Sequence, residues 1–298
     1  MEAAFKLPAA QQQAALGALL TQLVDSRDRV GLCELAQGLL VEAQCPRPLA
    51  GDVLRLLPPL LTALPSTEGA FTEHVCLSLT DALRAQQVAA LDDVDVGLRD
   101  ALYDVKMQQG QYYAAGAALA AGQIDTAPHL DAPTRGYLWV RVCQAFLRCE
   151  DDVTAERYIK KASDLSRHMS KDVLMMYTTT MAQMLDYKKQ FLQAAVKFDD
   201  ISRRGQALDF PPDELLLFLG HAVRCTLLAP VSPARMRMMG SLSRDDRIPF
   251  IQVRRRWGAA LPWPLPASPH ALHCRALAHP PPPPTPLLSL CCSPCCSA

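Results

Sequence analysis

Residues 184–195 read Met-Leu-Asp-Tyr-Lys-Lys-Gln-Phe-Leu-Gln-Ala-Ala, and they carry the pattern that decides the fold. The polar residues 188–190 separate two apolar segments, and Ala194 follows soon after this turn. The same arrangement of a polar turn and an alanine occurs at Ala115 and Ala155, so the three alanines are 40 and 39 residues apart. A repeat of this length is typical of stacked helical hairpins.

The segments beside each turn carry apolar residues at helical spacing. Before the first turn, Leu98, Leu102 and Val105 fall at positions 0, +4 and +7, which places them on one face of a helix. The alternation of β-branched residues that would indicate strands is absent. A small residue after each turn lets the second helix approach the first at a separation of ~8–10 Å. We therefore expect an all-α fold, a solenoid of TPR-like helical hairpins, because each hairpin buries its apolar face only by stacking on its neighbours.

Composition divides the chain into three regions. Residues 1–94 carry less regular helical stripes and are expected to form N-terminal helical repeats, whereas residues 95–248 carry the regular TPR-like hairpins. Residues 249–298 hold 12 of the 24 prolines, 5 of the 11 cysteines and no acidic residue. This bias is typical of translated GC-rich non-coding sequence, so we interpret the region as a disordered, aberrant tail rich in proline and cysteine.

The charge balance excludes several function classes. The whole chain has 30 basic and 30 acidic side chains, but four arginines lie in the tail, so residues 1–248 carry 26 basic and 30 acidic groups and a net charge of −4. Neither this balance nor any basic patch interleaved with aromatic residues favours a nucleic-acid partner. No secretory signal opens the chain, and prolines interrupt the longest apolar stretch outside the tail, residues 56–64. We therefore expect no direct membrane contact.

The sequence contains none of the common catalytic motifs, such as a phosphate-binding glycine loop, G-x-S-x-G or H-E-x-x-H. The adjacent carboxylates Asp151 and Asp152 lie in a turn, where we expect them to cap the next helix. His221 lies beside an apolar stripe and is interpreted as a core or interface histidine. The cysteines outside the tail form no C-x-x-C pair, which is typical of reduced, buried thiols in an intracellular protein. We predict no catalytic residue, no cofactor and no metal ion.

Two features of the tail leave other functions open. Acylation of Cys291, Cys292, Cys295 and Cys296 would make the chain a lipid-anchored helical-repeat adaptor. His270 and His273 form an H-x-x-H pair that could bind a metal together with the tail thiols, as in a metal hydrolase, although the tail offers no acidic ligand.

Several segments of the chain resemble, in their order and spacing, the COP9 signalosome subunit 4 family of PCI-domain proteins. The segments are residues 98–103, 112–119, 150–163, 184–195, 221–229 and 235–247. The resemblance implies a right-handed array of helical hairpins that ends in a winged-helix module. A proteasome lid subunit of the PCI type has the same architecture and is the alternative within this class.

The resemblance also implies a function. The family's complex removes a ubiquitin-like modifier from cullin-RING ligases, a reaction called deneddylation, and its metal-dependent centre lies in another subunit. A chain of this family is expected to be a non-catalytic scaffold in the cytoplasm and nucleus, with the other COP9 signalosome subunits and cullin-RING ligase as partners. After residue 248 the chain departs from the family, because Pro249 opens the tail where the family continues toward the winged helix. We therefore expect a chain truncated before that module.

Overall fold

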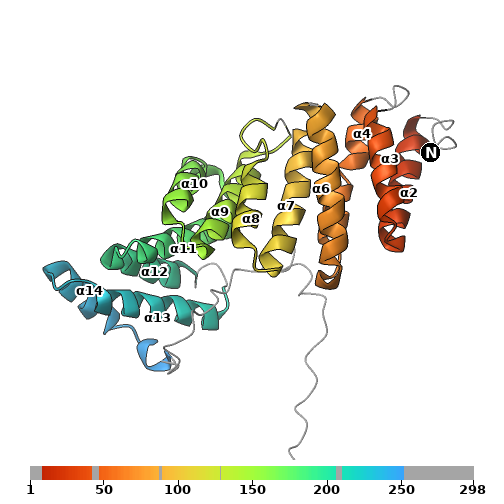
Figure 1. Ribbon diagram of the computed structural model, residues 1–298. Coiled ribbons are helices and arrows are strands. Elements are labelled where there is room, and N and C mark those ends of the chain that lie inside the picture. The colour runs from red at the N-terminus through yellow and green to blue at the C-terminus, as the bar shows by residue number, and fades with distance from the viewer. Residues whose placement is uncertain (1–8, 42–46, 87–88, 128, 206–209, 252–298) are drawn as a thin grey trace, which may run out of the picture. The chain divides into compact units, whose positions relative to one another are not determined.

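The computed structural model describes residues 9–41, 47–86, 89–127, 129–205 and 210–251. Within these ranges the chain forms α-helices and short 3-10 helices and no β-strand (Figure 1). The predicted all-α fold is thus confirmed. Contacts divide the chain into a unit of residues 1–255 and a unit of residues 256–298, and every described helix lies in the first. The tail cysteines, His270 and His273 lie outside the described residues.

Five helices open the first unit: α2 (Ala9–Ser26), α3 (Arg29–Val41), α4 (Arg47–Leu54), α5 (Leu57–Thr62) and α6 (Gly69–Gln86). Helix α2 packs against α3, α4 and α5, and α3 packs against α6. Leu16 and Leu20 of α2, Leu32 of α3 and Leu57 of α5 are fully buried. The N-terminal region is therefore helical, as its apolar stripes predict.

Eight further helices follow as four successive hairpins. They are α7 (Asp92–Gln108) with α8 (Tyr112–Ala120), α9 (Ala132–Arg148) with α10 (Asp152–Asp164), α11 (Lys171–Tyr187) with α12 (Phe191–Arg204), and α13 (Pro212–Leu228) with α14 (Pro233–Leu242). The 3-10 helices are η1 (Ser66–Glu68), η2 (Ala89–Leu91), η3 (Ser166–His168) and η5 (Ile248–Phe250). Each of these eight α-helices packs against the next along the chain, and α9 also packs against α11 (Figure 1). The predicted stack of helical hairpins is confirmed.

The first three of these hairpins turn by the same backbone route. One residue in each turn has a positive φ: Gly110 (76°), Glu150 (61°) and Lys189 (59°). The N–H of the following residue then donates to a carbonyl five residues back, with distances of 2.9, 3.1 and 2.9 Å. This is the Schellman ending of a helix, which satisfies carbonyls left unpaired in the last turn. The three residues repeat the 40- and 39-residue spacing, so the repeat is a property of the backbone as well as of the side chains.

Small residues let the helices approach closely. Ala115, Ala155 and Ala194 are all fully buried, which agrees with the helix-contact role predicted for them. A Cβ atom added at Gly116 of α8 would lie only 3.1 Å from the Cβ of Ala145 on α9. Larger side chains at these positions would therefore force the helices apart.

Helix α7 joins two clusters of buried apolar residues. Its residues Leu98 and Leu102 belong to the cluster formed with the N-terminal helices. Its residues Val96 and Tyr103 belong to the second cluster, which extends through α8, α9 and α10 to α11. The N-terminal helices and the regular hairpins are thus linked through a shared helix.

Candidate protein-interaction surface

The described part of the chain contains no group of three or more histidine, cysteine, aspartate or glutamate residues that could hold a metal ion. Among the same residues, no helix is long and apolar enough to cross a bilayer. The metal-hydrolase hypothesis rests on the H-x-x-H pair and the lipid-anchor hypothesis on the tail cysteines. Both features lie outside the described residues.

The paired carboxylates have structural partners. Asp151 is the N-cap of α10, and its side chain accepts a hydrogen bond from the backbone N–H of Thr154 at 3.0 Å. This confirms the predicted capping role. Asp199 and Asp200 form ion pairs one helical turn along α12, with Arg203 at 3.0 Å and Arg204 at 2.8 Å.

His221 lies on α13 with its ring 5.4 Å from the ring of Phe198 on α12. Burial, with the nearby positive charge of Arg224, lowers the pKa of His221 from 6.5 to about 4. A histidine that stays neutral and packs on an aromatic ring fits the predicted role in the core or at an interface.

The described cysteines are not activated for chemistry. Cys76 and Cys143 are fully buried, and burial raises the pKa of Cys76 to about 12 and that of Cys143 further. Burial is also the main reason why the pKa of Cys225 rises to about 12, with a further contribution from Asp186. Because the thiolate is the reactive form, these thiols are inert at neutral pH.

Charged residues that were not predicted from the sequence link successive hairpins. Arg141 on α9 is only 6% exposed and pairs with Asp100, at 2.5 Å, and with Asp104, both on α7. Its guanidinium carbon lies 4.2 Å from the centre of the Tyr103 ring. Arg224 on α13 pairs with Asp186 on α11 at 2.5 Å. Both contacts join residues about one repeat apart, so they hold one hairpin against the next.

The last described hairpin carries an open hollow of about 970 Å³, which we call the arginine hollow. It lies between α12, α14 and the turn after α14. Its lining residues are Arg203, Met236, Arg237, Gly240, Ser241, Arg244, Asp245, Asp246 and Arg247.

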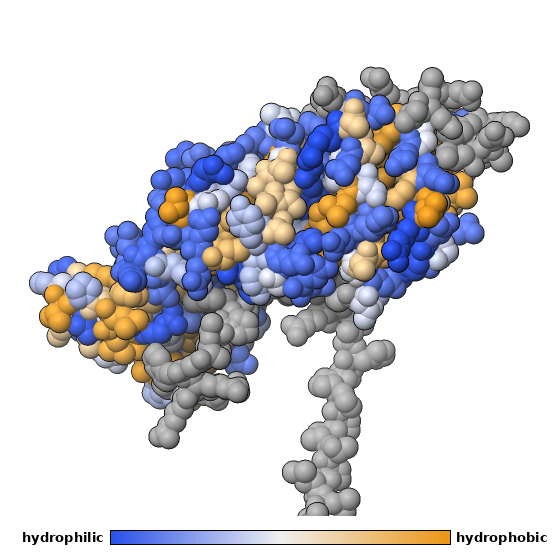
Figure 2. Space-filling model, in the orientation of Figure 1, coloured by the Kyte–Doolittle hydropathy of each residue, from blue (hydrophilic) through white to orange (hydrophobic). Residues whose placement is uncertain are grey.

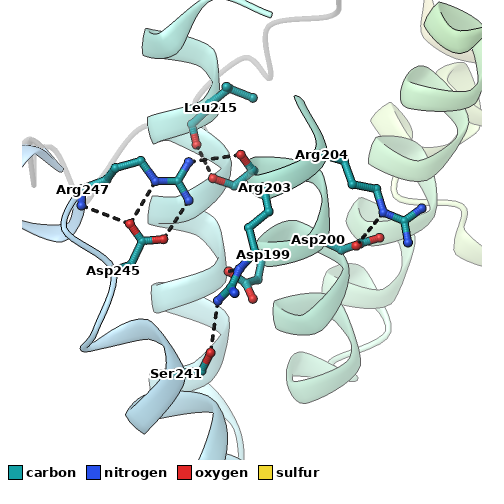
Figure 3. A network of polar contacts seen from close by, with 9 residues as sticks. Asp199, Asp200, Arg203, Arg204, Leu215, Ser241, Asp245 and Arg247 are labelled. Carbon is teal, nitrogen blue, oxygen red and sulfur yellow. Dashed lines mark hydrogen bonds and ion pairs between the residues drawn. The ribbon is translucent and has the colours of Figure 1, made fainter. Parts of the chain in front are cut away.

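Hydrogen bonds fix two of these arginines (Figure 3). Arg203 donates to Asp199 at 3.0 Å and to the hydroxyl of Ser241 at 3.1 Å, which joins α12 to α14. Arg247 donates to both carboxylate oxygens of Asp245, at 2.9 and 2.7 Å, and to the carbonyl of Ser202 at 3.1 Å. Asp245 thereby has a pKa held below its usual range, mainly by its hydrogen bond with Arg247. One wall of the hollow is therefore preorganised.

Hydrophobic side chains are exposed around the same hairpin. Figure 2 shows hydrophobic residues gathered over α13 and α14. The exposed ones are Leu217, Leu227, Leu228, Val231 and Met236. Exposed apolar side chains together with a charged hollow have the composition of a protein-interaction surface.

The hollow was not predicted from the sequence, although one signal pointed to it. Residues 235–247 contain four arginines, a local density far above that of the neighbouring helices. Three of them, Arg237, Arg244 and Arg247, line the hollow with Arg203, and this depends on how α14 and its following turn lie beside α12, which no local pattern encodes.

Comparison with known proteins shows which proteins this chain is similar to. No model of a known protein family matches the chain. Three similar proteins are each named COP9 signalosome complex subunit 4: those of Emericella nidulans, Caenorhabditis elegans and Arabidopsis thaliana. The chain is 26% identical to the first over 166 residues, 27% identical to the second over 175 and 34% identical to the third over 119.

These matches cover part of each protein. They include 55%, 56% and 38% of this chain and 40%, 42% and 30% of the three relatives, in the same order. A fourth relative of the same name, from Dictyostelium discoideum, is 29% identical over 165 residues. Agreement among relatives from a fungus, an animal, a plant and an amoeba confirms the resemblance found in the sequence: over about half of its length, this chain is related to COP9 signalosome subunit 4.

Proposed function

We propose that this chain is a non-catalytic scaffold subunit of a COP9 signalosome assembly, and that it supports the deneddylation of cullin-RING ligases through protein–protein contacts. The similarity to subunit 4 proteins of four organisms carries this proposal. The relatives found bear the signalosome name, which favours this complex over the proteasome lid.

The described structure supports the scaffold role in two respects. Stacked hairpins present extended surfaces suited to partner proteins, and the last described hairpin exposes both apolar and charged side chains. Asp151 caps a helix, and Asp199 and Asp200 form ion pairs within one, so these carboxylates have structural roles. The proposed partners are the other signalosome subunits and cullin-RING ligase, in the cytoplasm and nucleus.

Affinity purification of the full tagged chain from cells that contain the signalosome tests this proposal. We expect mass spectrometry to recover signalosome subunits and cullins above the level of an untagged control. The variant Arg204→Ala is a suitable surface control, because Arg204 is exposed and pairs only locally with Asp200. Recovery of proteasome lid subunits alone, or of neither complex, would overturn the assignment.

The non-catalytic role has its own test. The purified chain, incubated with a cullin that carries the ubiquitin-like modifier, is expected to release none of it with or without added zinc. Release by the chain alone would contradict the scaffold role and would revive the metal-hydrolase hypothesis built on His270 and His273.

A further inference from the structure

The arginine hollow has an excess of positive charge that the chain itself does not neutralise. Four arginines and two aspartates line it, and Asp199 pairs with Arg203 from outside the lining, so the net formal charge of these groups is +1. Arg203 and Arg247 are held by Asp199 and Asp245. Arg237 and Arg244 are exposed, and neither forms an ion pair with any residue in the part of the chain that the structure describes. Two guanidinium groups are therefore available to a ligand.

The hollow also has an apolar component. Met236 is 61% exposed and lines it together with Gly240. An unbranched, polarisable methionine adapts to different apolar partners and is common at binding surfaces. A ligand that matches the whole hollow therefore combines negative charge with an apolar side chain.

Size and charge favour a peptide over a phosphate compound. A volume of about 970 Å³ is large enough for several side chains. Asp245 and Asp246 lie in the same hollow, and they would repel a densely charged polyphosphate. Carboxylates spaced along a peptide can reach Arg237 and Arg244 while avoiding those two aspartates, and arginine pairs with carboxylates in bidentate geometry.

The tail of this chain cannot supply such a ligand from its side chains. Residues 252–298 contain four arginines and no aspartate or glutamate. This charge pattern therefore favours an acidic segment of a partner protein over residues 252–298 as the ligand.

We infer that the arginine hollow is a docking site for an acidic segment of a partner protein, with carboxylates paired to Arg237 and Arg244 and an apolar side chain placed on Met236. This inference rests on the proposed function in one respect: the segment belongs to a subunit of the same assembly.

Fluorescence anisotropy with the full purified chain tests the site. The probe is the labelled peptide Gly-Glu-Asp-Leu-Asp-Glu-Leu-Gly, and the control probe is its neutral counterpart Gly-Gln-Asn-Leu-Asn-Gln-Leu-Gly. We expect the acidic probe to bind at least about tenfold more tightly than the neutral one at low salt, and binding to weaken as salt is added.

Charge-reversal variants locate the binding. The double variant Arg237→Glu/Arg244→Glu is expected to weaken binding of the acidic probe by about tenfold or more, with an unchanged melting temperature because both side chains are exposed. The matched control is Arg204→Glu, an exposed arginine of α12 that does not line the hollow, and it should change the affinity less than about twofold. The variant Met236→Ser should weaken binding of the acidic probe while leaving its salt dependence intact.

Several results would overturn the inference. They are equal binding of the two probes, an unchanged affinity in the double variant, or an equal loss in Arg204→Glu, which would indicate non-specific attraction. Displacement of the probe by inorganic pyrophosphate at far lower concentration than by the unlabelled peptide would assign the hollow to a free polyanion instead.

The inference and the proposed function can fail separately. If tagged wild-type chain recovers signalosome subunits and the double variant recovers them equally, the proposed function stands and the docking site is wrong. If wild-type chain recovers none, the proposed function fails whatever the peptide result.

Discussion

At the scale of single residues, Ala194 is one of the alanines that recur in each repeat, and it lies where helices pack together. Its side chain is fully buried on α12, and α12 packs against both α11 and α13. We expect Ala194→Trp to lower the free energy of unfolding by at least about 1–3 kcal/mol, because no space exists for an indole there. Val196→Trp, on the exposed face of the same helix, should change it little. Thermal unfolding followed by circular dichroism measures both, and an unchanged melting temperature for Ala194→Trp would contradict the helix contact.

His221 predicts a dependence of stability on pH. Its pKa is about 4 in the folded chain, against 6.5 for an exposed histidine, chiefly because of burial. Between these values the unfolded chain binds the proton more readily, so protonation favours unfolding. The contribution of neutral His221 to the free energy of unfolding is thus fully present above pH 6.5 and is lost as the pH falls toward 4. The free energy of unfolding should fall over this range by up to about 1.4 kcal/mol per pH unit.

Urea denaturation from pH 7 down to pH 4 would measure this slope. The variant His221→Gln keeps a polar side chain but cannot titrate, so we expect a flatter pH dependence than in the wild type. The remaining slope in the variant reports the carboxylates, such as Asp245, whose pKa is lowered mainly by Arg247. Identical slopes for the two proteins would mean that His221 is solvated.

At the scale of elements, equivalent positions in the turns need the same positive φ but carry different residues, so opposite substitutions should have opposite effects. Gly110 adopts its positive φ without strain, and a Cβ there would meet no atom within 4 Å. A substitution would therefore be unfavourable only because of the backbone conformation. Gly110→Ala should therefore cost about 1 kcal/mol. Lys189 has the same conformation with a side chain, so Lys189→Gly should stabilise the chain by up to about 1 kcal/mol. Chemical denaturation compares the two variants, and a change of the same sign in both would contradict the shared turn.

Helices and turns were predictable because their causes are local. The stripe of Leu98, Leu102 and Val105 reflects one buried face of one helix, and all three side chains are buried. The Asp151 cap depends only on the N–H of Thr154, three residues later. Such signals lie within a few residues of one another, so the sequence alone reveals them.

Contacts between hairpins were not predictable in the same way. Arg141 and Asp100 are 41 residues apart, and neither differs in type from the exposed charges around it. Only the repeat period suggests the pairing, since Arg224 and Asp186 are 38 residues apart in equivalent helices. The arginine hollow is harder still to predict, because Arg203 and Arg237 line it from α12 and α14, which are not consecutive helices.

At the scale of the whole chain, Arg141 joins α9 to α7, the helix that the two apolar clusters share. Its guanidinium joins Asp100 and Asp104 of α7 to α9, and the Tyr103 hydroxyl donates to the Arg141 carbonyl at 2.9 Å. Arg141→Met keeps most of the side-chain volume but leaves two carboxylates without their cation. We expect it to cost about 1–3 kcal/mol, less than for a fully buried pair because both carboxylates are partly exposed.

The position of the Arg141 contact predicts which helices lose stability in Arg141→Met. Stability in stacked repeats is the sum of each hairpin and its interfaces with its neighbours, so weakening one interface lowers the cooperativity between the two sides. Native-state hydrogen exchange should therefore show faster exchange in α7 and α9 of Arg141→Met, while α12 and α13 keep their protection. Lys160→Met, which removes an exposed cation from α10, is the control and should leave all four helices unchanged. A uniform loss of protection along the chain in Arg141→Met would mean that the hairpins unfold as one unit and that α7 is not a joint between two clusters.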